Sequence, residues 1–172
     1  RGLISMDDKL IVFGSKKPAA VFGVGPTRDG QQNNYTVQVV EIGTGMGSDA
    51  ESSLALTPDG VWFYSSLAGM RFLTRGLQLG SDDQRQSFMG NEVDDKFTAA
   101  PIAVKPAGRS QVQFWGSNLS HPMVYDFQRK QWSQHNLQSG PATALDSVVY
   151  FAPTTSTVWK FQGSAGTRDG TA

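Results

Sequence analysis

The sequence repeats one pattern, in which a short run of aromatic and branched apolar residues, a tight polar turn and a second such run follow one another. The four copies of this pattern span residues 7–23, 58–76, 108–127 and 146–163. The aromatic ends of the first runs, Phe13, Tyr64 and Trp115, are each 51 residues apart, and Phe151 follows 36 residues later. A four-stranded blade of a β-propeller occupies about 40 to 50 residues. The spacing therefore predicts an all-β fold built of about three to four antiparallel β-propeller blades, as part of a larger propeller.

The composition of the runs supports strands rather than helices. Runs such as "VWFY" and "SVVYF" are continuously apolar, as strands buried on both faces are, and no stretch keeps an apolar period of 3.6 residues. Helix is expected to be absent or a single turn. A two-sheet sandwich with coincidental spacing is the alternative architecture. Strands are predicted at residues 9–14, 19–23, 35–42, 53–57, 61–66, 70–74, 101–105, 111–116, 122–127, 131–135, 146–151 and 157–162.

The motif "TPDG" predicts a chain reversal between two of these strands. Pro58 sets φ for the first corner of a turn, Asp59 can accept a hydrogen bond from its own backbone, and Gly60 tolerates a positive φ. These three residues are the predicted structural turn.

The chain offers little to build an enzyme site. It has 15 basic and 15 acidic residues and no cysteine, so it carries no net field that attracts nucleic acid and no thiolate metal site. There is no G-x-S-x-G motif, and "FGVGPTRDG" fails as a dinucleotide fingerprint because Pro26 interrupts it. His121 and His135 are interpreted as surface histidines without a role. No catalytic, cofactor-binding or metal-binding residue is predicted, and the chain is not expected to be an enzyme.

Three pairs of adjacent aspartates are interpreted as turn residues, because neighbouring carboxylates on a loop point in different directions. The pairs are Asp7–Asp8, Asp82–Asp83 and Asp94–Asp95.

The predicted organisation is one set of blades over residues 1–163, followed by a small, polar C-terminal linker or tail at residues 164–172. Because the chain starts at Arg1 in a strand-like pattern, it is expected to be a piece of something longer. No run approaches the ~18 apolar residues of a membrane span, so no membrane insertion is expected of this segment.

Three segments in chain order resemble the β-propeller hub or nozzle proteins in the tails of short-tailed bacteriophages (podoviruses), also described as stabilisation or tail tubular B-like proteins. They are "DDKLIVFGSKKPAAVFGVGP" (7–26), "EIGTGMGSDAESSLALTPDGVWFYSSLAGMRFLTRGLQ" (41–78) and "MVYDFQRKQWSQHNL" (123–137). Two departures stand out. The family's proteins are far longer, and its cysteine-containing loop is here "GTGMGSDAES".

The resemblance implies a structural virion protein without a cofactor. It would form a homo-hexameric ring below the portal and adaptor and line part of the DNA-ejection channel, with DNA only in transit. Its partners would be other tail proteins, namely the adaptor, the portal-side ring and a tail fibre or needle. The protein would be made in the host cytoplasm and located in the virion tail. Blade-core positions are expected at Phe13, Phe22, Trp62, Phe63, Phe72, Phe114, Tyr125, Trp132, Tyr150 and Trp159.

Two other functions compete with this one. A carbohydrate- or receptor-binding propeller would use exposed aromatic rings, and Trp132 and Trp159 are the candidate platforms. A propeller glycoside hydrolase would need two carboxyl groups that face one cleft at a set separation.

Two intervals, residues 23–34 and 79–97, are too long and too polar for simple blade connections. Long loops of this kind are often functional, so partner contacts are predicted there. The candidate contact residues are Arg28, Asp29, Asp82, Asp83 and Arg85.

The second interval can be tested by deletion of Ser81–Asn91 from the full-length protein. Folding should stay nearly intact, because the closure entropy of a loop changes by only about 0.6 kcal/mol per doubling of its length. Incorporation into tails should fall, measured as the amount of the protein in purified particles. Infectious particles at normal yield would mean that this segment is not an interface.

Overall fold

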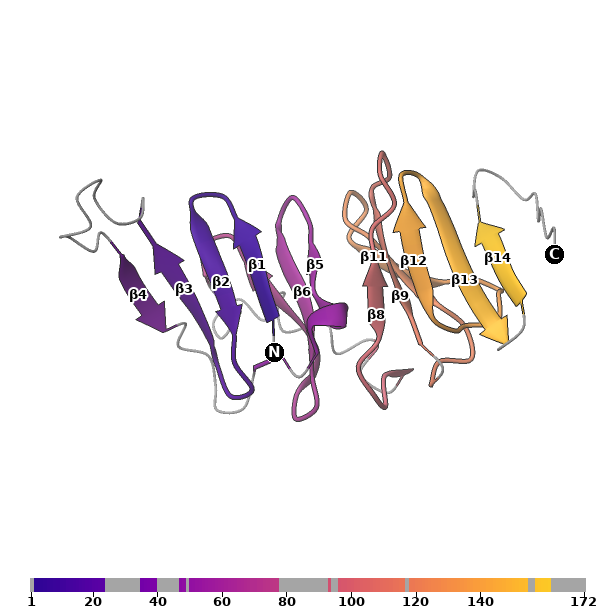
Figure 1. Ribbon diagram of the computed structural model, residues 1–172, viewed down its shortest axis with the longest axis horizontal. Helices are drawn as coiled ribbons and strands as arrows, with labels where there is room; N and C mark the ends of the chain where they lie inside the picture. The colour runs from indigo at the N-terminus through magenta and orange to yellow at the C-terminus, as the bar shows by residue number, and fades with distance from the viewer. Residues whose placement is uncertain are drawn as a thin grey trace. The chain divides into compact units, whose positions relative to one another are not determined.

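The fold of the chain is seen in a computed structural model. The structure describes residues 2–23, 35–39, 47–48, 50–77, 93, 96–116, 118–154 and 157–161. Within these residues fourteen strands form four antiparallel sheets, and in every sheet each strand pairs with its neighbours in sequence (Figure 1). All four sheets are therefore simple meanders.

The chain divides into two compact units, residues 1–94 and 95–172. The first unit holds the first sheet, formed by β1 (Gly2–Met6), β2 (Lys9–Phe13), β3 (Pro18–Phe22) and β4 (Thr36–Val39), and the second sheet, formed by β5 (Ala55–Leu56), β6 (Gly60–Ser65) and β7 (Gly69–Thr74). The second unit holds the third sheet, formed by β8 (Ile102–Val104), β9 (Gln111–Trp115), β10 (Met123–Asp126) and β11 (Gln131–Gln134), and the fourth sheet, formed by β12 (Ala142–Leu145), β13 (Val148–Thr154) and β14 (Thr157–Phe161).

The all-β class is confirmed over the described residues. Each of the twelve predicted strands overlaps an observed strand, and the helix found in this part of the chain is one 3-10 turn, η1 (Glu51–Ser53). The predicted strand ranges omit β1, although the start of the chain has a strand-like pattern, and they omit β12. The sequence of β12, "ATAL", has low intrinsic strand preference, and its pairing with β13 stabilises it as a strand. The proposed tail at residues 164–172 lies outside the described residues.

The 51-residue repeat corresponds to one position in the architecture. Phe13 lies in β2, Tyr64 in β6, Trp115 in β9 and Phe151 in β13. Each of these strands is the second strand of its sheet. The spacing seen in the sequence is therefore the spacing between equivalent strands of successive meanders.

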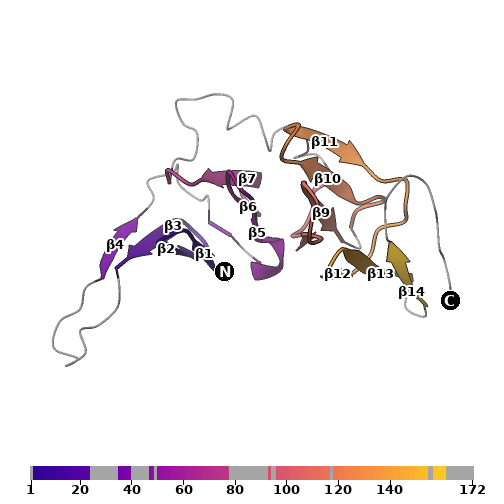
Figure 2. The same cartoon turned by 90° about the horizontal axis from the view of Figure 1, so that it is seen from above.

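In each unit the two sheets approach each other at or beside their first strands. In the first unit β1 begins beside the segment that leads into β5. The two backbones come so close there that a Cβ on Gly2 would lie 2.7 Å from Cδ1 of Leu54 and 3.1 Å from Cα of Glu51. The two sheets then diverge toward β4 and β7 (Figure 2). In the second unit β8 contacts β12, which are again the first strands of their sheets.

The core of the first unit lies between the facing sides of its two sheets. Phe13 of β2 packs against Phe63 of β6 with ring centroids 5.0 Å apart. Every residue of β6 is buried, as its unbroken apolar sequence predicts. The remaining buried members of this cluster are Met6, Ile11, Ala20, Val61 and Leu73.

The core of the second unit repeats this arrangement. Trp115 of β9 packs against Phe151 of β13, with ring centroids 4.8 Å apart, and Val104 and Val149 complete the buried cluster. The indole N–H of Trp115 donates to Oε1 of the fully buried Gln113 at 3.1 Å, which satisfies a polar group that burial would otherwise leave costly.

The strand β13 differs from the expectation of burial on both faces. Val149 and Phe151 are buried, but Val148 and Tyr150 are only half-buried. Val148 and Tyr150 point to the face of the fourth sheet that lies away from the core, because side chains alternate between the two faces of a strand.

The predicted turn at Pro58–Asp59 closes the β5–β6 hairpin. The backbone N–H of Thr57 donates to the carbonyl of Gly60 at 2.7 Å, and the N–H of Gly60 donates back at 3.3 Å. Gly60 has φ +155°, and a Cβ there would lie 2.0 Å from the carbonyl oxygen of Leu73. The close approach of β7 is therefore the main reason why this position needs glycine.

We expect Gly60→Val to lower the free energy of unfolding by about 1–3 kcal/mol, because the added side chain meets the β7 backbone. Chemical denaturation measures this loss. Gly76→Val is the matched control, since the nearest atom to a Cβ there is Oγ1 of Thr74 at 3.8 Å. Equal losses in the two variants would contradict the role given to the close approach.

Candidate functional site

The outer face of the first sheet carries several exposed apolar side chains. It is the face opposite the core cluster of Met6, Ile11 and Phe13. Side chains alternate along each strand, so the register of β1 to β4 places one set of residues on this face. That set is Leu3, Ser5, Leu10, Val12, Ala19, Val21, Val37 and Val39.

Seven of these eight side chains are apolar, and several of them are open to solvent. Leu3 is 58% exposed and Val37 is 63% exposed. Large exposed apolar patches are uncommon on monomeric proteins and usually mark contact sites. The outer face of the first sheet is therefore a candidate interaction surface.

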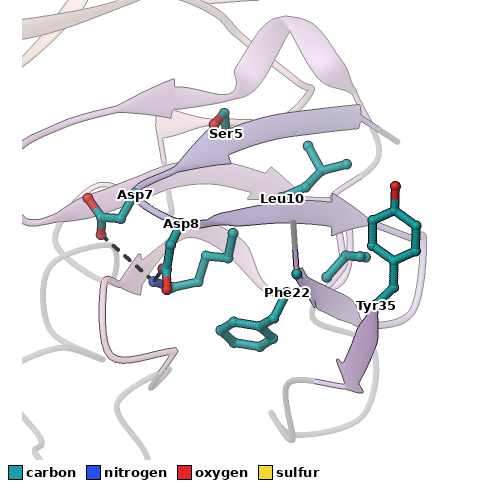
Figure 3. Close-up of a pocket in the computed structure, with 9 residues that line it drawn as sticks. Ser5, Asp7, Asp8, Leu10, Phe22 and Tyr35 are labelled. Atoms are coloured by element: carbon teal, nitrogen blue, oxygen red, sulfur yellow. Dashed lines mark hydrogen bonds and ion pairs between the residues drawn. The ribbon is translucent and has the colours of Figure 1, made fainter. Parts of the chain in front are cut away.

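A shallow depression of about 300 Å³ lies where this face meets the β1–β2 turn (Figure 3). Ser5, Leu10 and Val21 line it from the sheet, and the half-exposed ring of Tyr35 lies beside them. Figure 3 shows Phe22 on the other side of the strands from Leu10. Lys9 is paired with Phe22 in the register of β2 and β3, and its ammonium lies 5.9 Å from the centroid of the Phe22 ring.

Charged groups gather at the rim of the depression. The ammonium of Lys9 donates to Oδ1 of Asp8 at 3.0 Å and lies 3.8 Å from Oδ2 of Asp7. The hydrogen bond from Lys9, followed by one from the backbone N–H of Asp8 itself, holds the pKa of the Asp8 carboxyl below its ordinary value. Asp8 therefore stays ionised and presents a negative charge at an exposed corner of the sheet.

Arg75 connects the first sheet to the second. Its guanidinium donates to the carboxylate of Asp7, to the carbonyl of Pro58 and, at 3.1 Å, to the carbonyl of Thr57. It therefore holds the β1–β2 turn against the predicted structural turn at Pro58–Asp59. Asp7 has φ 57°, a conformation that aspartate tolerates better than most residues.

The outer face of the fourth sheet is a second exposed surface. It carries Thr143, Leu145, Tyr150, Val158 and Lys160, by the register of β12 to β14. Leu145 is 65% exposed and Val158 is 64% exposed. A shallow and largely apolar depression of about 280 Å³ lies between Thr143, Tyr150 and Val158.

The aromatic residues predicted as blade core fall into three groups. Trp159 is 40% exposed, which differs from the buried position expected of it, because β14 is the edge strand of its sheet. Phe22, Trp132 and Tyr150 are half-buried. The buried ones are Phe13, Trp62, Phe63, Phe72, Phe114 and Tyr125.

The sequence analysis interpreted both histidines as surface residues, whereas in the structure both are half-buried. His121 is half-buried, and its Nδ1 lies 2.8 Å from the carbonyl of Leu137. His135 packs edge-on against Phe161 with ring centroids 5.0 Å apart. Burial, and to a smaller extent the charge of Arg109, lowers the pKa of His135. The imidazole of His135 is therefore a neutral packing group.

The predicted loop contacts, Arg28, Asp29, Asp82, Asp83 and Arg85, lie outside the described residues. Among the residues that are described, no group of three or more His, Cys, Asp or Glu side chains could hold a metal ion, and no helix is long and apolar enough to cross a membrane.

The sequence analysis missed the two exposed faces. The segment "YTVQVV" alternates apolar and polar residues from Tyr35, a pattern typical of a strand with one buried or contact face. That alternation was a detectable sign of the first face. The ion pair of Asp7 with Arg75 joins residues 68 positions apart, and no local pattern reveals it.

No protein-family model matches the chain, and a search of curated proteins finds no match.

The link through Arg75 can be tested by a double-mutant cycle with Arg75→Met and Asp7→Asn. Asparagine also tolerates the positive φ at position 7, so the second change removes charge and leaves the turn. Because both side chains are partly exposed, we expect a coupling energy of about 0.5–1 kcal/mol from denaturation curves, smaller at high salt. Strictly additive losses would mean that the two turns are not coupled.

Proposed function

We propose that this chain forms blades of a β-propeller that serves as a structural component of a short-tailed bacteriophage tail. In this proposal it belongs to the hub or nozzle ring below the portal and adaptor, and helps to form the DNA-ejection channel. The observation that carries the proposal is the recurrence of one unit, the antiparallel meander, whose aromatic second strands follow one another at 51, 51 and 36 residues.

The packing of the sheets supports the propeller. Blades of a propeller surround a central channel and pack face to face. Neighbouring blades must therefore approach most closely at their inner strands and separate outward. In the second unit the first strands of the two sheets contact each other, and in the first unit β1 begins beside the segment that leads into β5. In both units aromatic residues of the second strands pack between the facing sheets.

The segments that resemble the tail family coincide with complete hairpins. The first contains β2 and β3, the second contains β5 to β7, and the third contains β10 and β11. A resemblance that follows hairpins is what a shared blade architecture would produce. The balanced charge of the chain suits a protein that DNA passes without being held.

The proposed place in the virion can be tested by labelling. The β6–β7 turn at Leu67 is 80% exposed, so an epitope inserted there should leave the sheets intact. Particles that carry the tagged full-length protein should bind gold-labelled antibody at the tail, seen by electron microscopy. Label on the capsid, or tagged protein absent from purified particles, would contradict the assignment.

A carbohydrate-binding module is the second candidate, and the exposure of Trp159 favours it. Its indole N–H donates to Oγ1 of Thr157 at 3.2 Å, which holds the ring on the edge strand β14. Trp132 suits this role less, because its ring lies against Phe114 and Tyr125 at 5.6 and 5.1 Å.

A glycan array separates the two candidates. The tail component should bind no glycan specifically, whereas a carbohydrate-binding module should bind one with millimolar or tighter affinity and lose it on Trp159→Ala. Val158→Ala is the matched control, since it changes the neighbouring exposed residue on the other face of the same strand.

A further inference from the structure

One aromatic contact joins the edge strands of the third and fourth sheets. In the fourth sheet, β14 pairs with β13 alone, and its last residue, Phe161, packs against the core cluster that contains Trp115 and Phe151. The ring of Phe161 also lies edge-on to the imidazole of His135, with ring centroids 5.0 Å apart. His135 directly follows β11, which is the edge strand of the third sheet.

The surroundings of His135 suit the neutral imidazole. Its Nε2 is buried and has no hydrogen-bond partner among the described residues. The guanidinium of Arg109 lies 5.9 Å from the centroid of the same Phe161 ring. A protonated imidazole carries two N–H donors and a positive charge. Here it would leave a buried donor without an acceptor and would place its charge near a second cation, and both effects are unfavourable.

The other charged groups on the surrounding elements do not compensate for a charge on His135. Lys160 of β14 points to the outer face of the fourth sheet, by the register of β13 and β14. Asp126 and the basic residues of the β10–β11 turn lie at the opposite end of β11, and Asp146 lies in the β12–β13 turn. Burial and the charge of Arg109 therefore lower the pKa of His135, and no acidic side chain that the structure describes opposes them.

Two further titratable groups of the second unit have contacts of their own. The Nδ1 of His121 lies 2.8 Å from the carbonyl oxygen of Leu137, and the ammonium of Lys105 lies 5.8 Å from the centroid of the Phe127 ring. His121 is therefore a control for His135, since it is a half-buried histidine of the same unit with a different environment.

We propose that the contact between His135 and Phe161 is an acid-sensitive switch that holds β14 against the third sheet at neutral pH and releases it at mildly acidic pH. Protonation of His135 expels the imidazole from the Phe161 ring, and β14 then loses its contact with the edge of the third sheet. The pairing of β14 with β13 remains, so the strand opens locally while the cores of both units stay folded. The inference does not depend on a role in a phage tail.

The direction of the pH dependence follows from which state binds the proton. The pKa of His135 lies lower in the folded protein than its ordinary value of 6.5, which applies to the unfolded chain. The contact therefore stabilises the fold fully well above pH 6.5, and this stabilisation is lost as the pH falls through the lowered folded-state pKa. Carboxyl groups of ordinary pKa titrate mostly below about pH 5, so the range from about pH 5 to 7 reports on the two histidines.

Hydrogen exchange of the backbone amides in β14 tests the proposal, measured by NMR at about pH 7 and about pH 5 and corrected for intrinsic exchange rates. In the wild type, protection of β14 should fall about tenfold or more at the lower pH, whereas β6 in the first unit should keep its protection. His135→Phe keeps an aromatic ring against Phe161 and cannot be protonated, so it should abolish the change. His121→Phe should leave the change intact.

A second measurement isolates the effect of Arg109. In an NMR titration of the imidazole Cε1 proton, the pKa of His135 should lie below 6.5 in the wild type, and Arg109→Met should raise it and reduce the loss of protection at β14. Lys160→Met is the matched control, because it removes a cation from β14 on the other face and should change neither quantity.

Three results would each overturn the proposal: equal protection of β14 at the two pH values in the wild type, loss of protection at low pH in His135→Phe, or a pKa of His135 at or above 6.5. If circular dichroism at neutral pH shows that His135→Phe has lost its fold, the neutral and smaller His135→Gln replaces it, with the same expected result.

Discussion

The structure depends on the packing of aromatic second strands across each pair of sheets. An isolated meander of three or four short strands gains little from its backbone hydrogen bonds and needs a covered apolar face to be stable. Phe13 against Phe63, and Trp115 against Phe151, provide that cover at the centre of each pair. Because side chains alternate along each strand, the side of each sheet that this contact occupies decides which face is left exposed.

Much of the fold could be predicted from the sequence because its strongest elements are local. The run of β6 is apolar at every position, and the turn before it uses residues whose backbone preferences already match a reversal. The strand β12, which was missed, has a weaker sequence and is held by its partner β13. Its existence depends on the sheet more than on its own residues.

The candidate site was harder to predict than the fold. Tyr35 and Val37 belong to an alternating strand, but alternation alone does not say whether the apolar side faces a core or solvent. Trp159 shows that a side chain expected in the core can also be exposed. Its neighbours in sequence are those of a core strand, yet β14 is the last strand of its sheet and leaves the ring exposed. Which face is covered depends on the tertiary arrangement, and a single sequence does not encode it locally.

The position of β4 has a consequence for how the chain behaves during synthesis. It is the last strand of the first sheet, all four of its residues are exposed, and its sequence, "TVQV", has neither a charge nor a proline. Natural proteins use such residues on outer strands to prevent unwanted pairing of backbones. Without them, newly made chains at high concentration can add strand to strand before their sheets have packed. The yield of folded protein should then be governed by crowding of nascent chains, and slow expression at low temperature should recover more of it than any change to the core.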